Sequence, residues 1–314
     1  MEKSKFNLHI AKNNSEKGIW VYADYLANLE SKFRLSLNEG DTKQVEYLTG
    51  VSLKREDENP TGSWKDRGMA FLISYLYSKG IKEAIIPSSG NAAISSSAYS
   101  KMAGISLYVC ISPKTSKEKI EKIQNLGGRI IINERPISFC VRESKGKGYY
   151  NLRPSINEFA SEGYKTIAYE LFEQNGRIDD IFIPVSSGVG LLGIISGFLN
   201  LGFLPRIHAC QPSSVCPIGK LFDKSYKNEE SSPADSIVSK APPLANKVIG
   251  SINESKGSAW VIDSADILKV QEELAAKGII TSAEGALSLA SYYKAKKKRE
   301  VGKAVCLLTG TKYL

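Results

Sequence analysis

Residues 59–72 read Asn-Pro-Thr-Gly-Ser-Trp-Lys-Asp-Arg-Gly-Met-Ala-Phe-Leu, and this stretch places a single lysine, Lys65, at the expected start of a helix. Pro60 and Gly62 interrupt regular structure, and Ser63 is a good N-cap residue. The apolar residues that follow recur at helical spacing (Met69, Leu72, Ile73, Leu76). A lysine at a helix N-terminus lies near the positive end of the helix dipole, which favours the neutral amine. A neutral amine can attack an aldehyde and hold it as a Schiff base.

Strand-like and helical stretches alternate from residue 82 to residue 310. Short apolar runs predict strands at residues 82–90, 105–111, 128–133, 179–186, 206–211 and 303–310. Helical spacing of apolar residues predicts helices at residues 91–102, 116–126, 190–201, 266–276 and 283–295. This alternation predicts an α/β protein with parallel sheets that are covered by helices.

Two glycine-bearing loops, residues 88–91 (SSGN) and 186–190 (SSGVG), directly follow expected strands. Ligands of open parallel sheets bind beyond the carboxyl ends of the strands. Backbone N–H groups at the start of a helix can also converge on an anion. Both loops are therefore candidate ligand loops. Each also has a simpler interpretation, the first as a helix N-cap and the second as a tight strand–helix turn.

The composition is typical of a globular protein, with 42% hydrophobic and 24% charged residues in a chain of 314, which is long enough for two lobes. The formal net charge of +9 requires that nucleic acid and membrane surfaces be considered as partners. The basic residues are dispersed, however, and the one dense run, residues 294–299, is typical of a solvated helix end. We expect neither partner, and the positive field would suit an anionic substrate or cofactor.

The cysteines indicate a reducing compartment. There are five, none in a CxxC spacing: Cys110, Cys140, Cys210, Cys216 and Cys306. Apolar surroundings of most of them are typical of reduced, buried thiols. Residues 1–20 contain no signal-like pattern, and the apolar stretch 189–204 is too short to span a bilayer. We expect a cytoplasmic protein.

The two histidines, His9 and His208, are too few for a histidine metal cluster and lie near no nucleophile motif. We expect no metal site. An enzyme so poor in histidine needs another base, and Lys65 is the natural candidate.

Six segments, taken in order, resemble those of the pyridoxal-phosphate enzymes related to threonine synthase, cysteine synthase and the threonine dehydratases. They are residues 36–42 (SLNEGDT), 51–68 (VSLKREDENPTGSWKDRG), 87–105 (PSSGNAAISSSAYSKMAGI), 162–171 (EGYKTIAYEL), 184–193 (PVSSGVGLLG) and 307–313 (LLTGTKY). The resemblance implies a tryptophan synthase β-like fold of two open, twisted parallel sheets with helices on both faces. The smaller, mobile lobe would be residues 46–149, with Lys65 and the SSGN loop. The larger lobe would be residues 1–45 and 150–314.

The resemblance also implies the site residues. Lys65 would hold pyridoxal 5'-phosphate as a Schiff base, Asn91 would bond the ring oxygen of the cofactor, and Thr309 would face its pyridine nitrogen. The cofactor phosphate would lie in a cup formed by Ser187, Gly188, Val189, Gly190 and Leu191. The substrate would be held by Ser88, Ser89, Gly90, Asn91 and Ser155. A neutral hydroxyl beside the pyridine nitrogen makes the ring a weaker electron sink, which favours elimination and replacement over transamination. A plain strand-end threonine is the simpler interpretation of Thr309.

The threonine synthase pattern is incomplete in the segment before residue 162. The positions that normally supply an arginine and an asparagine to the substrate phosphate are Ala160 and Pro154, and the usual asparagine of the cup is Ser187. An arginine fork is the strongest kind of phosphate contact. The candidates to replace it are the cations Arg153, Lys114 and Lys117.

These features lead to three hypotheses about function. The first is a pyridoxal-phosphate-dependent carbon–oxygen lyase of the threonine synthase type, which converts O-phosphohomoserine and water into L-threonine and phosphate. The second, favoured by the missing phosphate ligands, is a threonine or serine dehydratase or a β-replacement enzyme of the cysteine synthase type. The third is a relative that keeps the fold as a non-catalytic binding module. We expect a small amino-acid substrate and a homodimer.

Overall fold

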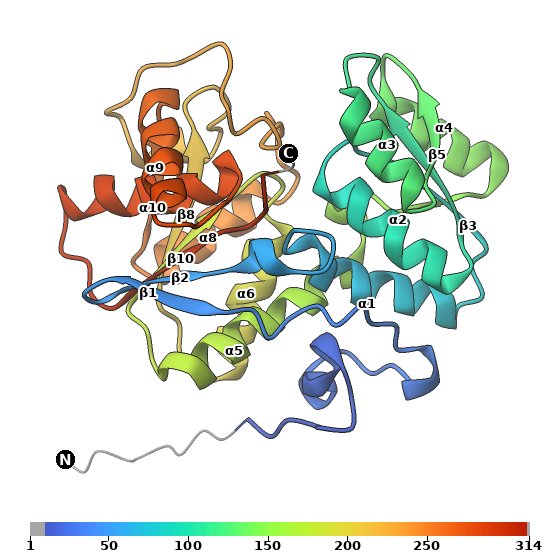
Figure 1. Cartoon of the computed structure of the whole chain (residues 1–314), viewed down its shortest axis with the longest axis horizontal. Helices are drawn as coiled ribbons and strands as arrows, with labels where there is room; N and C mark the ends of the chain where they lie inside the picture. The colour runs from blue at the N-terminus through green and yellow to red at the C-terminus, as the bar shows by residue number, and fades with distance from the viewer. Residues whose placement is uncertain (1–9, 313–314) are drawn as a thin grey trace.

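The chain forms two separate β-sheets flanked by helices (Figure 1). The computed structural model describes residues 10–312, so His9 and Tyr313 lie outside the described residues. Within these described residues, all strand pairs are parallel except one. Helices pack on both faces of each sheet. The expected α/β class is confirmed.

The larger sheet has six strands in the order β1-β2-β10-β7-β8-β9. Their bounds are β1 Gln44–Leu48, β2 Val51–Lys54, β10 Ala304–Leu307, β7 Asp180–Pro184, β8 Arg206–Pro212 and β9 Ser258–Ile262. Alternate residues of β7 show how its two faces are covered. Ile181 and Ile183 pack into the core that contains α6 (Val189–Asn200) and α8 (Ala245–Glu254), whereas Phe182 packs into the core of α10 (Ala283–Lys296).

The smaller sheet has four parallel strands in the order β5-β4-β3-β6. Their bounds are β3 Glu83–Pro87, β4 Ser106–Ile111, β5 Arg129–Ile132 and β6 Tyr150–Asn151. Ile86 packs toward α2 (Asn91–Ala103), whereas Ile85 packs toward Cys140 on the opposite face. The remaining helices are α1 Lys65–Ser78, α3 Lys117–Asn125, α4 Pro136–Lys147, α5 Lys165–Asn175, α7 Gly219–Phe222 and α9 Ser264–Ala276.

The strand pairing shifts the expected ends of the smaller lobe. Strands β1 and β2 fall largely within residues 46–149, yet they form an antiparallel hairpin that joins the six-stranded sheet beside β10. Strand β6, at residues 150 and 151, pairs with β3 in the four-stranded sheet. The hairpin was not expected because its two strands are short and its partner β10 lies some 250 residues away in the sequence, Ala304 being paired with Val51.

Helix α1 packs closely against the 3-10 helix η5 (Glu158–Tyr164), and at Gly163 the two backbones are in direct contact. A Cβ atom on Gly163 would lie 1.8 Å from the carbonyl oxygen of Arg67, and a Cβ atom on Gly68 would lie 2.6 Å from Cε2 of Tyr164. Both positions therefore require glycine. Among residues 10–312, no helix is long and apolar enough to cross a membrane.

Candidate active site

A cavity of about 650 Å³ opens at the carboxyl ends of strands from both sheets. All twelve residues expected at the site line this cavity: Lys65, Ser88, Ser89, Gly90, Asn91, Ser155, Ser187, Gly188, Val189, Gly190, Leu191 and Thr309. They come from five segments of the chain that are far apart in the sequence. The structure thus brings the whole predicted set together, while the role of each residue stays a prediction.

Lys65 is the first residue of α1, and the chain before it is tied to the end of β10. The Trp64 N–H donates to the carbonyl oxygen of Thr309 (3.1 Å), and Ser63 forms an isolated bridge with Gly310. The expected N-cap was Ser63, but the cap residue is Trp64, because Ser63 is held by this bridge. The Ser63 Oγ accepts only a long hydrogen bond from the Lys65 N–H (3.4 Å).

The Lys65 amine lies in the wall of the cavity, against two aromatic rings. Its Nζ is 4.6 Å from the centroid of the Trp64 ring and 5.8 Å from that of the Tyr164 ring. Burial lowers the pKa of Lys65 from 10.5 to about 8. Desolvation is the cause of this lowered pKa, and the contribution expected from the helix dipole stays a prediction. At neutral pH, this amine is much closer to its reactive form than an exposed lysine is.

The loop between β7 and α6 forms a cradle for an anion. Gly188 has a φ of +90°, and a Cβ atom on Gly190 would lie 2.6 Å from the Trp64 ring, so both positions depend on glycine. The first N–H groups of α6 have no partner within the helix. This cradle, with the hydroxyl of Ser187 beside it, suits a phosphate. The residues therefore fit the expected cofactor, whose phosphate would lie here and whose aldehyde carbon would reach Lys65.

The loop between β3 and α2 carries the expected substrate ligands. The Ser88 Oγ accepts from the Gly90 N–H (3.4 Å), and Asn91 is the first residue of α2. A Cβ atom on Gly310 would lie 2.8 Å from Nδ2 of Asn91, so this glycine makes room for the Asn91 amide. Thr309 is buried next to it, at 4% exposure.

Asp66, directly after Lys65, holds the preceding turn. Its carboxylate accepts from the Thr61 N–H (2.7 Å) and from the Thr61 hydroxyl (2.5 Å). Burial raises the pKa of Asp66 to about 6, in spite of these hydrogen bonds. The contact fixes the turn from which α1 starts.

Arg67 anchors α1 in a fully buried group of charges, which we call the Arg67 cluster (Lys54, Glu56, Arg67, Glu170). The guanidinium donates to Glu56 (Nη2–Oε1 2.6 Å) and to Glu170 (Nη1–Oε1 2.6 Å), and Lys54 Nζ donates to Glu170 Oε2 (2.7 Å). Burial alone would raise the pKa of Glu170, but Arg67 and Lys54 lower it well below its usual range. The two positive and two negative groups compensate one another's charge. The first turn of α1 is therefore held by Thr61 before Lys65, through Asp66, and by the Arg67 cluster after it.

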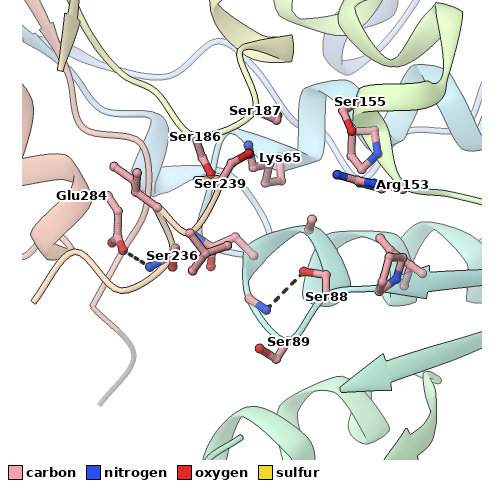
Figure 2. A pocket seen from close by; sticks show the side chains of 18 of the residues that line it. Lys65, Ser88, Ser89, Arg153, Ser155, Ser186, Ser187, Ser236, Ser239 and Glu284 are labelled. Carbon is pink, nitrogen blue, oxygen red and sulfur yellow. Dashed lines mark hydrogen bonds between the residues drawn. The ribbon is translucent and has the colours of Figure 1, made fainter. Parts of the chain in front are cut away.

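Residues 235–239 and Glu284 line the cavity as well, and sequence reasoning missed them. The sequence alone assigned no role to residues 227–243. The Asp235 carboxylate pairs with Lys119 of α3 (3.2 Å), and the Ser236 N–H donates to Glu284 (2.9 Å, Figure 2). Three residues of this stretch, Ala234, Ile237 and Pro242, are buried. Apolar residues in an otherwise polar stretch were the available sign that it packs against the rest of the protein.

The structure also separates the candidate cations. Arg153 and Lys114 both line the cavity, as do Pro154 and Ser155, whereas Lys117 does not contribute to its lining. Ala160 is buried in the core at 3% exposure and is not part of the cavity wall either. Of the three cations named from the sequence, two therefore reach the cavity.

Comparison with known proteins assigns this architecture to a family. Residues 36–310 match the family described as "Pyridoxal-phosphate dependent enzyme". The chain is 30% identical to the threonine synthase of Methanocaldococcus jannaschii, over 94% of this chain and 80% of that protein. It is 29% identical to the threonine synthase of Methanosarcina acetivorans, over 93% and 79% of the two chains.

Solved structures share the fold at lower sequence identity. Maize serine racemase superposes with a TM-score of 0.77 at 20% identity, covering 87% of this chain and 88% of that one. Threonine deaminase isoform 2 from Solanum lycopersicum superposes with a TM-score of 0.72 at 19% identity, covering 84% and 75%.

Proposed function

Because the chain belongs to the family of pyridoxal-phosphate-dependent enzymes, with pyridoxal phosphate as its cofactor, we propose that it is a threonine synthase that converts O-phosphohomoserine and water into L-threonine and phosphate. One observation carries the proposal. The buried Lys65 amine, with its pKa of about 8, faces the same cavity as both glycine-bearing loops. Identity to threonine synthases over more than nine tenths of the chain supports the choice of reaction.

The residues of the cavity divide the work. When bound, the cofactor withdraws electrons from the α-carbon of the amino acid. Ser88, Ser89, Gly90 and Asn91 bind the substrate's α-carboxylate at the start of α2. Lys65 takes and returns protons at the substrate's carbon atoms, so that phosphate leaves from the γ-carbon and water adds at the β-carbon. By resemblance to the family, the Thr309 hydroxyl would face the ring nitrogen of the bound cofactor. A neutral hydroxyl there would leave that nitrogen unprotonated and favour loss of a leaving group.

A second candidate, a threonine or serine dehydratase or a β-replacement enzyme, is favoured by Ala160. This residue takes the place of the arginine that threonine synthases use, and it lies in the core, away from the cavity wall. Pro154 likewise offers no amide. A substrate whose leaving group is a hydroxyl or an acetyl group would not need either contact.

A panel of single substrates separates the two candidates. The purified enzyme should be yellow, and with O-phosphohomoserine it should release phosphate and form threonine in equal amounts. Threonine, serine and O-acetylserine should be turned over far more slowly. Keto acid from threonine without threonine from O-phosphohomoserine would reject the threonine synthase assignment. A colourless protein that takes up no added cofactor would favour the non-catalytic binding module.

We further propose that the enzyme is a cytoplasmic homodimer in which the smaller lobe moves relative to the larger one. The resemblance to the family supports these three points. Light scattering of the purified protein tests the dimer, and scattering at small angles with and without substrate tests the movement.

A further inference from the structure

The segment that carries Arg153 is held rigidly at the edge of the cavity. The Arg153 N–H donates to Asn151 Oδ1 (3.1 Å), and the Arg153 carbonyl oxygen accepts from Asn157 Nδ2 (2.8 Å). The Asn157 amide also donates to the carbonyl oxygen of Asn151 (3.0 Å). This backbone gives the arginine a fixed base at the end of β6, so little freedom remains to be lost when its side chain binds a ligand.

The side chain of Arg153 has no partner within the protein. It lines the cavity and is half-buried, and among residues 10–312 no oxygen accepts a hydrogen bond from its guanidinium and no carboxylate pairs with it. In the view of Figure 2, Arg153 and Ser155 lie together on one side of Lys65. A guanidinium presents five N–H donors in a planar fork that matches a carboxylate or a phosphate. The N–H donors of this half-buried guanidinium therefore have no protein acceptor among the described residues, and a bound anion would supply one.

The acidic residues of the cavity have partners of their own and do not pair with Arg153. The acidic residues that line it are Asp235 and Glu284; the first pairs with Lys119 and the second accepts from the Ser236 N–H. In Figure 2, Glu284 lies on the side of Lys65 opposite to Arg153. No carboxylate of the described residues therefore competes for the guanidinium of Arg153.

Lys114 also lines the cavity, but this residue is exposed to solvent. An exposed ammonium contributes little, because water already satisfies it and salt screens it. Arg153 is therefore the group that can distinguish between ligands.

We propose that Arg153 determines which substrates bind. Its guanidinium would make a bidentate contact with an anionic group at the end of the substrate's side chain. The substrate class is then an α-amino acid with a second anion, phosphate or carboxylate, about three bonds beyond its β-carbon. The identification of that anion as a leaving phosphate rests on the proposed function, whereas the recognition itself does not. Neutral amino acids such as serine and threonine leave the guanidinium without a partner.

Binding of inert ligands to the cofactor-loaded enzyme tests the proposal. The first probe is the phosphonate in which a methylene replaces the ester oxygen of O-phosphohomoserine, so that the phosphorus group cannot leave. L-α-Aminoadipate presents a carboxylate at the same place, and L-norvaline has the same chain without an anion. Calorimetry gives the dissociation constant of each ligand for the natural enzyme and for Arg153→Met, Arg153→Lys and Lys114→Met. Arg142→Met, which removes an exposed guanidinium on α4, is the matched control.

We expect Arg153→Met to weaken the preferred anionic ligand by roughly ten- to a hundredfold and to leave L-norvaline unchanged. Arg153→Lys should recover part of this loss, Lys114→Met should change binding by less than about fivefold, and Arg142→Met should change nothing. The phosphonate and aminoadipate arms decide between phosphate and carboxylate. Equal weakening of norvaline and the anions, or no weakening of any ligand, would overturn the proposal.

The same variants keep this proposal apart from the proposed function. If the natural enzyme makes threonine from O-phosphohomoserine and Arg153→Met binds the phosphonate normally, the inference fails and the function stands. If the enzyme makes no threonine but Arg153→Met loses an anionic ligand selectively, the function fails and the inference stands.

Discussion

Arg67 and Arg153 show two opposite ways in which this protein places a guanidinium. All three nitrogens of Arg67 donate to acceptors within the protein, and the side chain is completely buried. Arg153 is half-buried, and none of its guanidinium nitrogens finds an acceptor among residues 10–312. The same contrast extends to the lysines, because Lys54 is paired in the Arg67 cluster, whereas Lys65 in the cavity forms no ion pair within the described part of the chain. Paired charges hold the fold, and unpaired charges face the ligands.

Lys65→Ala gives the largest effect on the cavity side of this comparison. Without the amine, the enzyme should lose both the proposed covalent link to the cofactor and the proposed proton-transferring group, which alone is worth roughly 10²–10⁴-fold in rate. The melting temperature of the cofactor-free protein should hardly change, because Lys65 has no charged partner among residues 10–312. Turnover, the visible absorption of the cofactor and thermal melting are the measurements. Lys79→Ala, at the exposed end of the same helix, is the control. A large loss of stability in Lys65→Ala would contradict the division of roles.

Arg67→Met gives the largest effect on the paired side. It leaves Glu56 and Glu170 buried with only Lys54 to compensate them, so the free energy of unfolding should fall by about 3–5 kcal/mol. Urea unfolding of the cofactor-free protein measures this loss. Adding Glu56→Gln to the variant should recover part of it, because the uncompensated charge is then removed. Arg142→Met should stay within about 0.5 kcal/mol of the natural protein. A similarly small change in Arg67→Met would show that the cluster does not hold the fold.

A smaller effect is expected from pH, which should act differently on the Lys65 amine in the cavity and on the Arg67 cluster. The folded pKa of Lys65 is about 8, so the neutral amine that captures the cofactor is present above this pH and is lost as the pH falls through it. The rate of cofactor uptake by cofactor-free protein should therefore fall about tenfold for each pH unit below 8. The folded pKa of Glu170 is lowered, so the stability from its ion pairs persists above its unfolded pKa and is lost only in acid. Uptake that is independent of pH between about 6 and 8 would show that the Lys65 amine is not the titrating group. Stopped-flow absorption provides the rates.

The sequence predicted those features that local patterns encode. The strands from β3 to β5, β7, β8 and β10 lie where short apolar runs placed them, and all twelve expected site residues line one cavity. These strands and site residues are predictable because short sequence patterns, such as a strand end, a glycine or a helix start, mark them. The family resemblance supplied the residue roles, which remain predictions.

Features that depend on distant partners were not predictable. Arg67 and Glu170 are 103 residues apart, and nothing in either segment shows that they meet. The same holds for Ser236 and Glu284, 48 residues apart, which bring the 235–239 segment to the cavity. Burial of the Lys65 amine lowers its pKa, and burial follows from packing that no single segment reveals.

The contact between α1 and η5 limits how this enzyme can change. Since Gly163 meets the Arg67 carbonyl directly, there is no side chain at this point whose exchange could move the Lys65 turn by a fraction of an ångström. New substrate preferences must then arise from changes in segments such as residues 235–239. This segment lines the cavity, and the buried residues Ala234 and Ile237 hold it in place. A variant library screened for activity on new substrates would keep residues 61–68 and 160–166 constant and randomise residues 235–239.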